Sequence, residues 1–220
     1  MSADWRLLHA DEALLVLDKP SGLLSVPGRG PEHADCLSAR VQALYPDARV
    51  MHRLDMDTSG LLVMARSAEA QRQLGLDFAQ RRVDKRYEAV VAGLPCTGSA
   101  SPDGWQAVRL PLIVDWPNRP RSKVCFQHGK PSFTQWRRLD DHELPSGVVA
   151  SRLALWPHTG RSHQLRVHMQ ALGHPILGDR LYAPPSLQQA APRLLLHACQ
   201  LALPHPVSGQ WLVFDSPAPF

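Results

Sequence analysis

Proline is the residue that most restricts how this chain can fold. The 220 residues include 20 prolines. Each proline fixes φ and removes a backbone N–H group, so helices tend to stop or kink where one occurs. We therefore expect frequent turns and short elements rather than long helices. At this length, with 44% hydrophobic residues, the chain can still bury a substantial core.

The hydrophobic pattern favours strands over helices. Strands are expected at 13–17, 60–65, 132–139, 148–156, 194–203 and 210–214, and residues 85–92 alternate in polarity. Three helices are expected. The first covers about 35–45 and is capped by Asp35, the second follows Ser67, and the third runs from about Ser162 to Gly173. Surface loops are expected at 95–106 and, with a basic character, at 115–130. Strict βαβ alternation is missing, which predicts an α+β fold with a mixed, mainly antiparallel central sheet flanked by helices and loops.

Other bulk features narrow the class of protein. The chain shows no internal repeat or linker, so we expect a single domain over residues 1–220. A net charge of +4 gives a mild attraction to polyanions. The four cysteines form no CxxC pair and are expected to be reduced, mostly packed thiols. The N-terminus does not resemble a signal peptide and the apolar runs are too short for a bilayer, so we expect a cytoplasmic protein.

A metal site is not expected from the eleven histidines. His163 and His168 are five residues apart, which points them to different faces of a helix. No HExxH motif or Cys/His cluster occurs. Nucleotide-binding motifs are missing too. Gly28 and Gly30 have the spacing of the first two glycines of a dinucleotide-binding GxGxxG loop, but His33 occupies the position of the third. The P-loop, the GxSxG elbow and the kinase signature do not occur either.

Two polar segments could carry chemistry. The string HRLDMDTSG, at 52–60, places a base, carboxylates, hydroxyls and a glycine directly before a predicted strand. The string TGRSHQLRVH, at 159–168, begins a predicted helix, where an anion is favoured. On composition alone, a plain turn explains the first segment better, and an amphipathic helix with a solvated basic face explains the second. Tyr87 by itself reads as a core aromatic. The residues alone therefore do not supply a reaction.

The string HRLDMDTSGLLVMAR resembles the signature of the RluA family of pseudouridine synthases. The resemblance continues through DKPSGLLSVPG, KRYEAVVAG, TGRSHQLRVHMQALGHPILGD and PRLLLHACQLALPHP, and is poorest at 95–106. Within the family, PLIVDWPNRPRSKV and the chain length are most similar to members that act on both tRNA and 23S ribosomal RNA. Other members often carry a small N-terminal RNA-binding domain. Here the first predicted strand begins by Ala13, so no such domain is expected.

The resemblance implies roles for three catalytic residues. Asp55 matches the nucleophilic aspartate, which must be ionised to attack although its site excludes water. Arg166 matches the arginine whose charge keeps that aspartate ionised. Tyr87 matches the tyrosine that stacks on the base and accepts the proton from uracil carbon 5. Because the isomerisation moves no electrons and loses no group, neither a cofactor nor a metal is required.

The resemblance also implies a partner, structured RNA from tRNA (the anticodon loop) or 23S ribosomal RNA, bound by a monomer. Arg53 matches the residue that takes the place of the flipped uridine, where a planar guanidinium can stack on bases. The other expected RNA contacts are Arg119, Arg121, Lys123, Arg161 and His163.

Two other functions are compatible with parts of the pattern. One is a non-catalytic RNA-binding or ribosome-assembly protein, in which Asp55 merely shapes a turn. The other is a hydrolase that pairs Asp55 with His52 or His163. The combined aspartate, tyrosine and arginine disfavour the first. The two-residue offset between His52 and Asp55 gives no obvious nucleophile–base geometry, which disfavours the second.

Overall fold

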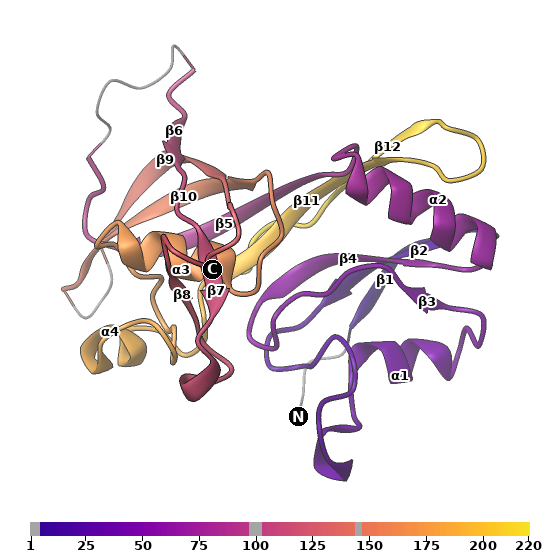
Figure 1. Cartoon of the computed structure of the whole chain (residues 1–220), viewed down its shortest axis with the longest axis horizontal. Helices are drawn as coiled ribbons and strands as arrows, with labels where there is room; N and C mark the ends of the chain where they lie inside the picture. The colour runs from indigo at the N-terminus through magenta and orange to yellow at the C-terminus, as the bar shows by residue number, and fades with distance from the viewer. Residues whose placement is uncertain (1–4, 97–102, 144–146) are drawn as a thin grey trace. The chain divides into compact units, whose positions relative to one another are not determined.

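The structure, a computed structural model, describes residues 5–96, 103–143 and 147–220 (Figure 1). Contacts within the chain define two compact units. The first comprises Met1–Lys85 and His197–Pro219, and the second Arg86–Leu196 with Phe220. That the chain forms one domain over 1–220 stays a prediction. In the described part of the chain, every helix is too short or too polar to cross a membrane.

The first unit is built on a sheet with the strand order β1-β2-β4-β11, in which β3 also pairs with β4 and β12 with β11. The strands are β1 (Arg6–Ala10), β2 (Leu14–Lys19), β3 (Arg49–Val50), β4 (Ser59–Ala65), β11 (Leu196–Pro204) and β12 (Trp211–Asp215). Strands β4 and β11 are parallel and the other pairs are antiparallel. Every residue of β2 and of β4 is buried, which requires cover on both faces of these strands.

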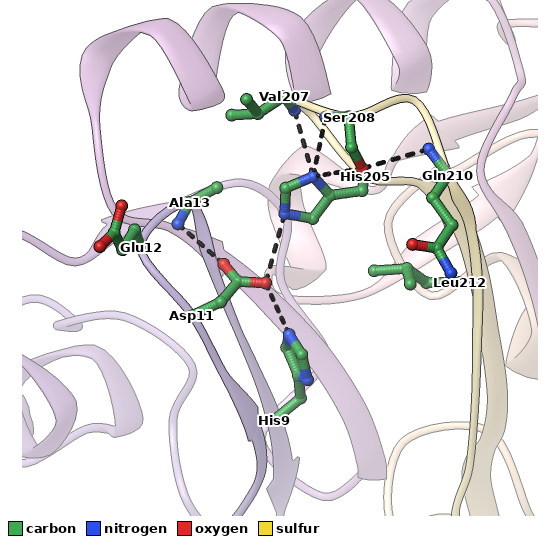
Figure 2. Close-up of a pocket in the computed structure, with 9 residues that line it drawn as sticks. All are labelled: His9, Asp11, Glu12, Ala13, His205, Val207, Ser208, Gln210 and Leu212. Atoms are coloured by element: carbon green, nitrogen blue, oxygen red, sulfur yellow. Dashed lines mark hydrogen bonds and ion pairs between the residues drawn. The ribbon is translucent and has the colours of Figure 1, made fainter.

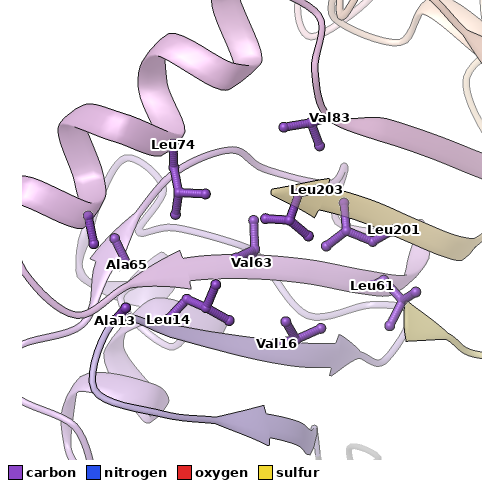
Figure 3. Packing of buried hydrophobic residues seen from close by; sticks show 11 residues of the cluster. Ala13, Leu14, Val16, Leu61, Val63, Ala65, Leu74, Val83, Leu201 and Leu203 are labelled. Atoms are coloured by element: carbon purple, nitrogen blue, oxygen red, sulfur yellow. The ribbon is translucent and has the colours of Figure 1, made fainter. Parts of the chain in front are cut away.

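That cover comes from two helices, α1 (Leu37–Gln42) and α2 (Ala68–Ala79), which Figure 1 shows on opposite sides of β2 and β4. Ser67 caps α2 as predicted, because its hydroxyl accepts the Ala70 N–H at 3.0 Å. The α2 side of the sheet holds the core cluster of Figure 3. Its members are Ala13, Leu14, Val16, Leu61, Val63, Ala65, Ala70, Leu74, Val83, Leu201 and Leu203.

Helix α1 is shorter than predicted and has a different cap. Cys36 is the N-cap residue, and its Sγ accepts the Ala39 N–H. Asp35 instead forms an ion pair with Arg40, with both N–O distances at 2.7 Å, so its carboxylate does not cap the helix. Leu44, near the end of the predicted helix, lies beyond α1 and is 67% exposed. The four cysteines are free as expected, but among them Cys36 alone is buried.

The second unit contains an antiparallel sheet with the order β5-β10-β9-β6. Its strands are β5 (Asp84–Ala92), β6 (Gln106–Val108), β9 (Thr134–Glu143) and β10 (Val149–Pro157), and its helices are α3 (Gln164–Ala171) and α4 (Pro185–Gln189). Gly173 follows α3 with φ +84°, the left-handed conformation predicted for this helix end. The predicted α+β class with a mixed, mainly antiparallel sheet is confirmed.

The basic segment 115–130 is not the extended loop that its prolines suggested. Strands β7 (Leu112–Val114) and β8 (Ser122–Val124) pair as a hairpin, with the short 3₁₀ helix η2 (Trp116–Asn118) at its turn. The hairpin was missed because each strand has three residues, too few for a clear alternation. Within the predicted loop at 95–106, residues 97–102 lie outside the described residues.

Candidate active site

The loop that carries Asp55 links β3 to β4 in the first unit, and a buried lysine anchors its backbone. Lys19 ends β2 and is fully buried. Its ammonium donates to three carbonyl oxygens: those of Pro20 at 2.8 Å, Leu23 at 2.7 Å and Met56 at 2.9 Å. A buried ammonium without hydrogen-bond partners would be costly. Since the partners of Lys19 come from both the turn after β2 and the Asp55 loop, the two segments stabilise each other.

Serines in the segment after β2 anchor the same loop on both sides of Asp55. The Ser25 hydroxyl donates to the Leu54 carbonyl at 2.7 Å and accepts the Leu54 N–H at 3.1 Å. The Ser21 hydroxyl donates to the Asp57 carbonyl at 2.7 Å. The Thr58 N–H donates to the Asp55 carbonyl at 3.1 Å and closes the turn. These anchors leave the Asp55 side chain half-buried, while Arg53 is exposed.

A buried chain of polar side chains fixes the start of β4, directly after this loop. The Ser59 hydroxyl lies 2.8 Å from Nδ1 of His197, and the other ring nitrogen lies 3.2 Å from the Ser216 hydroxyl. Ser216 donates to the Asp18 carboxylate at 2.8 Å. Next to Ser59, Gly60 has φ +110°, and a Cβ there would lie 2.3 Å from the Ala198 carbonyl oxygen. Only glycine allows β4 and β11 to approach so closely, which explains the glycine that ends HRLDMDTSG.

His52 is a structural residue of this loop rather than a base. Its Nε2 accepts the Val63 N–H at 3.1 Å, and its ring packs on Phe78 at 5.1 Å. Burial, with a smaller contribution from the charge of Lys85, lowers the pKa of His52 to about 3. The imidazole is therefore neutral near pH 7 and too weak a base to activate a nucleophile. This removes the hydrolase that pairs Asp55 with His52.

The low pKa of His52 predicts how stability depends on pH. The ordinary pKa is 6.5, so below that pH the unfolded chain binds a proton that the folded chain refuses until about pH 3. The free energy of unfolding is therefore not reduced by this group above pH 6.5. Below that pH it falls by at most about 1.4 kcal/mol per pH unit. Between pH 7 and pH 5, the free energy of unfolding measured with urea should fall less in His52→Asn than in the wild-type protein. The asparagine does not titrate, and its amide oxygen can still accept the Val63 N–H. Equal losses in both proteins would contradict the assignment.

In the second unit, Arg166 is buried in α3 and not on a solvated basic face. Its side chain is 3% exposed and that of Asp179 is 0% exposed. The guanidinium donates to both Asp179 oxygens, at 2.8 and 2.7 Å. The same carboxylate accepts the N–H groups of Leu181 and Tyr182, at 2.9 and 3.1 Å. Asp179 thereby fixes both the plane of the guanidinium and the segment after α3.

The start of α3 is fixed through His163, which has the left-handed φ of 56°. Its Nδ1 lies 2.7 Å from the Tyr182 hydroxyl, which also accepts the Ser122 N–H at 2.7 Å. Gln164 accepts the Arg161 N–H at 3.0 Å and donates to Thr134 at 2.9 Å. Because Tyr182 bonds both to His163 and to Ser122 of β8, the His163 ring also helps to stabilise the fold.

The remaining predicted site residues differ in exposure. Tyr87 in β5 is 9% exposed and pairs with Leu155 of β10. The other predicted RNA contacts in the second unit, Arg119, Arg121, Lys123 and Arg161, are exposed. Arg119 stacks on Trp116 with 3.9 Å to the ring centroid, and Lys123 pairs with Asp115 at 3.0 Å. The structure therefore groups Arg53 with Asp55 in one unit, and Tyr87, Arg166 and the remaining residues in the other.

A separate open pocket of about 430 Å³ lies in the first unit, at the turn between β11 and β12 (Figure 2). One of its two acidic residues, Asp11, lies 2.7 Å from His9 and 3.2 Å from His205. Burial raises the pKa of Asp11, but hydrogen bonds from His9, Leu14 and Ala13 and the charge of His205 lower it to about 2. In the described residues, no group of three or more His, Cys, Asp or Glu residues is suited to a metal. None of the predicted catalytic residues lines this pocket.

Comparisons with known proteins give a consistent result. The family model described as "RNA pseudouridylate synthase" matches residues 13–171. Proteins named "Dual-specificity RNA pseudouridine synthase RluA" are similar along nearly the whole length. That of Escherichia coli K12 is 49% identical over 97% of this chain and 93% of its own. That of Pasteurella multocida is 48% identical with the same coverage. The solved structure of Human RNA Pseudouridylate Synthase Domain Containing 1 has a TM-score of 0.79 and 27% identity, over 99% of this chain and 84% of its own.

Proposed function

The chain belongs to the RNA pseudouridylate synthase family and is an isomerase that acts on RNA. From this premise we propose that its substrates are the anticodon stem-loop of tRNA and stem-loops of 23S ribosomal RNA. We propose further that it works as a monomer in the cytoplasm, with Asp55 as the nucleophile. The similarity to proteins named as dual-specificity enzymes supports two classes of RNA substrate.

One observation carries the assignment of Asp55, and it is the anchored backbone on both sides of that residue. The peptide groups of Leu54, Met56 and Asp57 are all held by the segment 19–25. Such anchoring through the backbone fixes the position from which the side chain projects, which is what a nucleophile requires. A turn that merely reverses the chain would not need a fully buried lysine beneath it.

The proposed reaction exchanges one glycosidic bond for another. The Asp55 carboxylate forms a transient bond to the substrate, the bond between ribose carbon 1′ and uracil nitrogen 1 breaks, and the detached uracil turns. A bond then forms between carbon 1′ and uracil carbon 5. The proton on carbon 5 leaves to a base, and nitrogen 1 gains a proton, so the product has the composition of the substrate. The carboxylate is released unchanged.

Other residues take the proposed supporting roles. Tyr87 stacks on the uracil and accepts the carbon 5 proton. Arg166, oriented by Asp179, supplies positive charge that favours the ionised nucleophile. Arg53 fills the space that the flipped uridine leaves, and its exposure leaves it accessible to RNA.

The remaining proposed contacts position the RNA. Arg119, Arg121 and Lys123 hold the RNA backbone from the β7–β8 hairpin, and Arg161 and His163 add contacts at the start of α3. Such contacts fix the register of the RNA without reading its sequence.

Direct mapping of the product tests the substrates. The purified protein is incubated with an unmodified tRNA transcript, with fragments of 23S ribosomal RNA, and with a control tRNA in which cytidine replaces the modified uridine. We expect pseudouridine at one loop uridine in each natural RNA, detected by a pseudouridine-specific chemical adduct. Free uracil or an abasic ribose would indicate hydrolysis and contradict the isomerase. Product on one RNA class alone would contradict dual specificity.

A further inference from the structure

The outward face of the sheet in the second unit carries a continuous set of aromatic and arginine side chains, here named the arginine–aromatic face. Its members are Arg86, Trp105, Arg109, Phe133, Arg137, Trp156 and His158. Alternation along the strands places Arg86, Arg137 and Trp156 on this face, because their neighbours Tyr87, Trp136 and Leu155 are buried on the opposite one. The other four members lie directly beyond the ends of β6, β9 and β10. The face is therefore separate from the proposed catalytic tyrosine.

The rings form a connected cluster rather than one continuous stack, since Trp105 meets Trp156 edge-on at 63°. Phe133 and His158 are parallel, at 11°, with centroids 4.4 Å apart. His158 lies 4.5 Å from Trp156, which lies 5.9 Å from Trp105. The four rings are only partly buried. Large aromatics held half-exposed in contact with one another form a ready platform for flat ligands.

Guanidinium groups extend this platform. Arg86 lies over Trp156 with 3.3 Å to the ring centroid, and Arg109 lies over Phe133 at 3.6 Å. Arg137 lies 5.1 Å from the Trp105 centroid. A stacked guanidinium keeps its in-plane N–H groups available for phosphate, and its plane can itself stack on a base.

Two of these arginines carry charge that the described residues do not neutralise. Arg109 is exposed, and within the described part of the chain it forms neither an ion pair nor a hydrogen bond. Arg137 is also exposed and, within the same residues, makes one long hydrogen bond, 3.5 Å to the Asp103 carbonyl, and no ion pair. Earlier in β10, by contrast, Arg152 pairs with Glu88 at 2.9 Å. Positive charge thus remains unpaired beside the aromatic cluster.

We propose that the arginine–aromatic face binds a single-stranded RNA segment that flanks the stem-loop to be modified. Bases stack on the guanidinium planes that cover Trp156 and Phe133, while Arg109 and Arg137 contact phosphates. The inference rests on the proposed function, which supplies RNA as the partner. An acidic protein could satisfy the charges but would not use a platform of clustered rings, so RNA fits the whole surface better.

The test compares two double variants on two RNAs. Arg109→Gln/Arg137→Gln removes the unpaired charges, and Arg29→Gln/Arg72→Gln removes the same charge from exposed positions in the first unit. One RNA is a minimal stem-loop, and the other is the same stem-loop with a single-stranded extension. We expect the first variant to lose about tenfold in affinity for the extended RNA, with a salt slope smaller by about 1.4, since two phosphate contacts are lost. The matched control should change affinity less than about twofold.

The single-turnover rate on the minimal stem-loop separates this inference from the proposed function. That rate should stay at the wild-type value in both double variants, because neither pair belongs to the catalytic machinery. If the wild-type protein does not modify the stem-loop at all, the proposed function fails, while the binding data still decide the inference. Equal affinity losses in the two variants, or an extended RNA that binds no tighter than the minimal one, would overturn the inference.

A third variant, Arg109→Lys/Arg137→Lys, keeps the charges but removes the guanidinium planes. It should keep the salt slope of the wild-type protein but not its full affinity. Wild-type affinity in this variant would refute the stacking of bases on the arginines.

Discussion

Replacing Asp55 with asparagine should lower the single-turnover rate of isomerisation by about four orders of magnitude or more, because the amide has almost the same shape but cannot act as the nucleophile. The fold should be unaffected, since the loop is anchored through backbone groups of Leu54, Met56 and Asp57. RNA affinity should stay within about threefold of the wild-type value, because a single neutral replacement alters few contacts to phosphate. The measurement is the rate of pseudouridine formation with protein in excess over a tRNA stem-loop.

The matched control for this experiment is Asp57→Asn. Asp57 lies in the same loop, is half-buried like Asp55, and is held through its carbonyl by Ser21. The two variants therefore make the same chemical change two residues apart. Asp57→Asn should retain turnover within about tenfold, because it removes no group that bonds to the substrate. Rapid turnover by Asp55→Asn, or a larger loss in Asp57→Asn than in Asp55→Asn, would show that Asp55 is not the nucleophile.

The fold class could be predicted from the sequence because the long strands carry their own signal. Residues 60–65 form an apolar run, and 85–92 alternate, which local patterning detects. The β7–β8 hairpin could not be predicted that way, since its three-residue strands are stabilised by tertiary contacts such as the bond from the Ser122 N–H to Tyr182. Strand β1 was missed for a similar reason. Leu7 and Leu8 are 39% and 40% exposed, so this edge strand lacks a buried face.

For the candidate site, the sequence proposes a set of residues but not the contacts that hold them. The resemblance supplied Asp55, Tyr87 and Arg166, yet it did not indicate what holds them. The buried anchor Lys19 looks like an ordinary turn residue next to a proline, and its role depends on Met56, which lies 37 residues further along the chain. Asp179, the partner of Arg166, lies 13 residues beyond it, after a turn that no local pattern connects to the helix. Such long-range polar pairs are fixed by tertiary structure.

The ion pair between Arg166 and Asp179 leads to the second large effect. Arg166→Met should destabilise the protein by about 3–5 kcal/mol, because it leaves the fully buried Asp179 carboxylate without its counter-ion. The double variant Arg166→Met/Asp179→Asn should recover most of that stability. The asparagine side chain is neutral, and its oxygen can still accept the N–H groups of Leu181 and Tyr182. Urea unfolding of the two variants measures this difference.

Activity of the double variant then separates structure from chemistry. If Arg166 supplies charge to the nucleophile, the double variant should be folded but slower than wild type by about two orders of magnitude or more, since it lacks the cation that favours an ionised carboxylate. Asp179→Asn alone keeps the arginine and serves as the control, with a smaller loss. A stable double variant with wild-type turnover would confine Arg166 to a structural role.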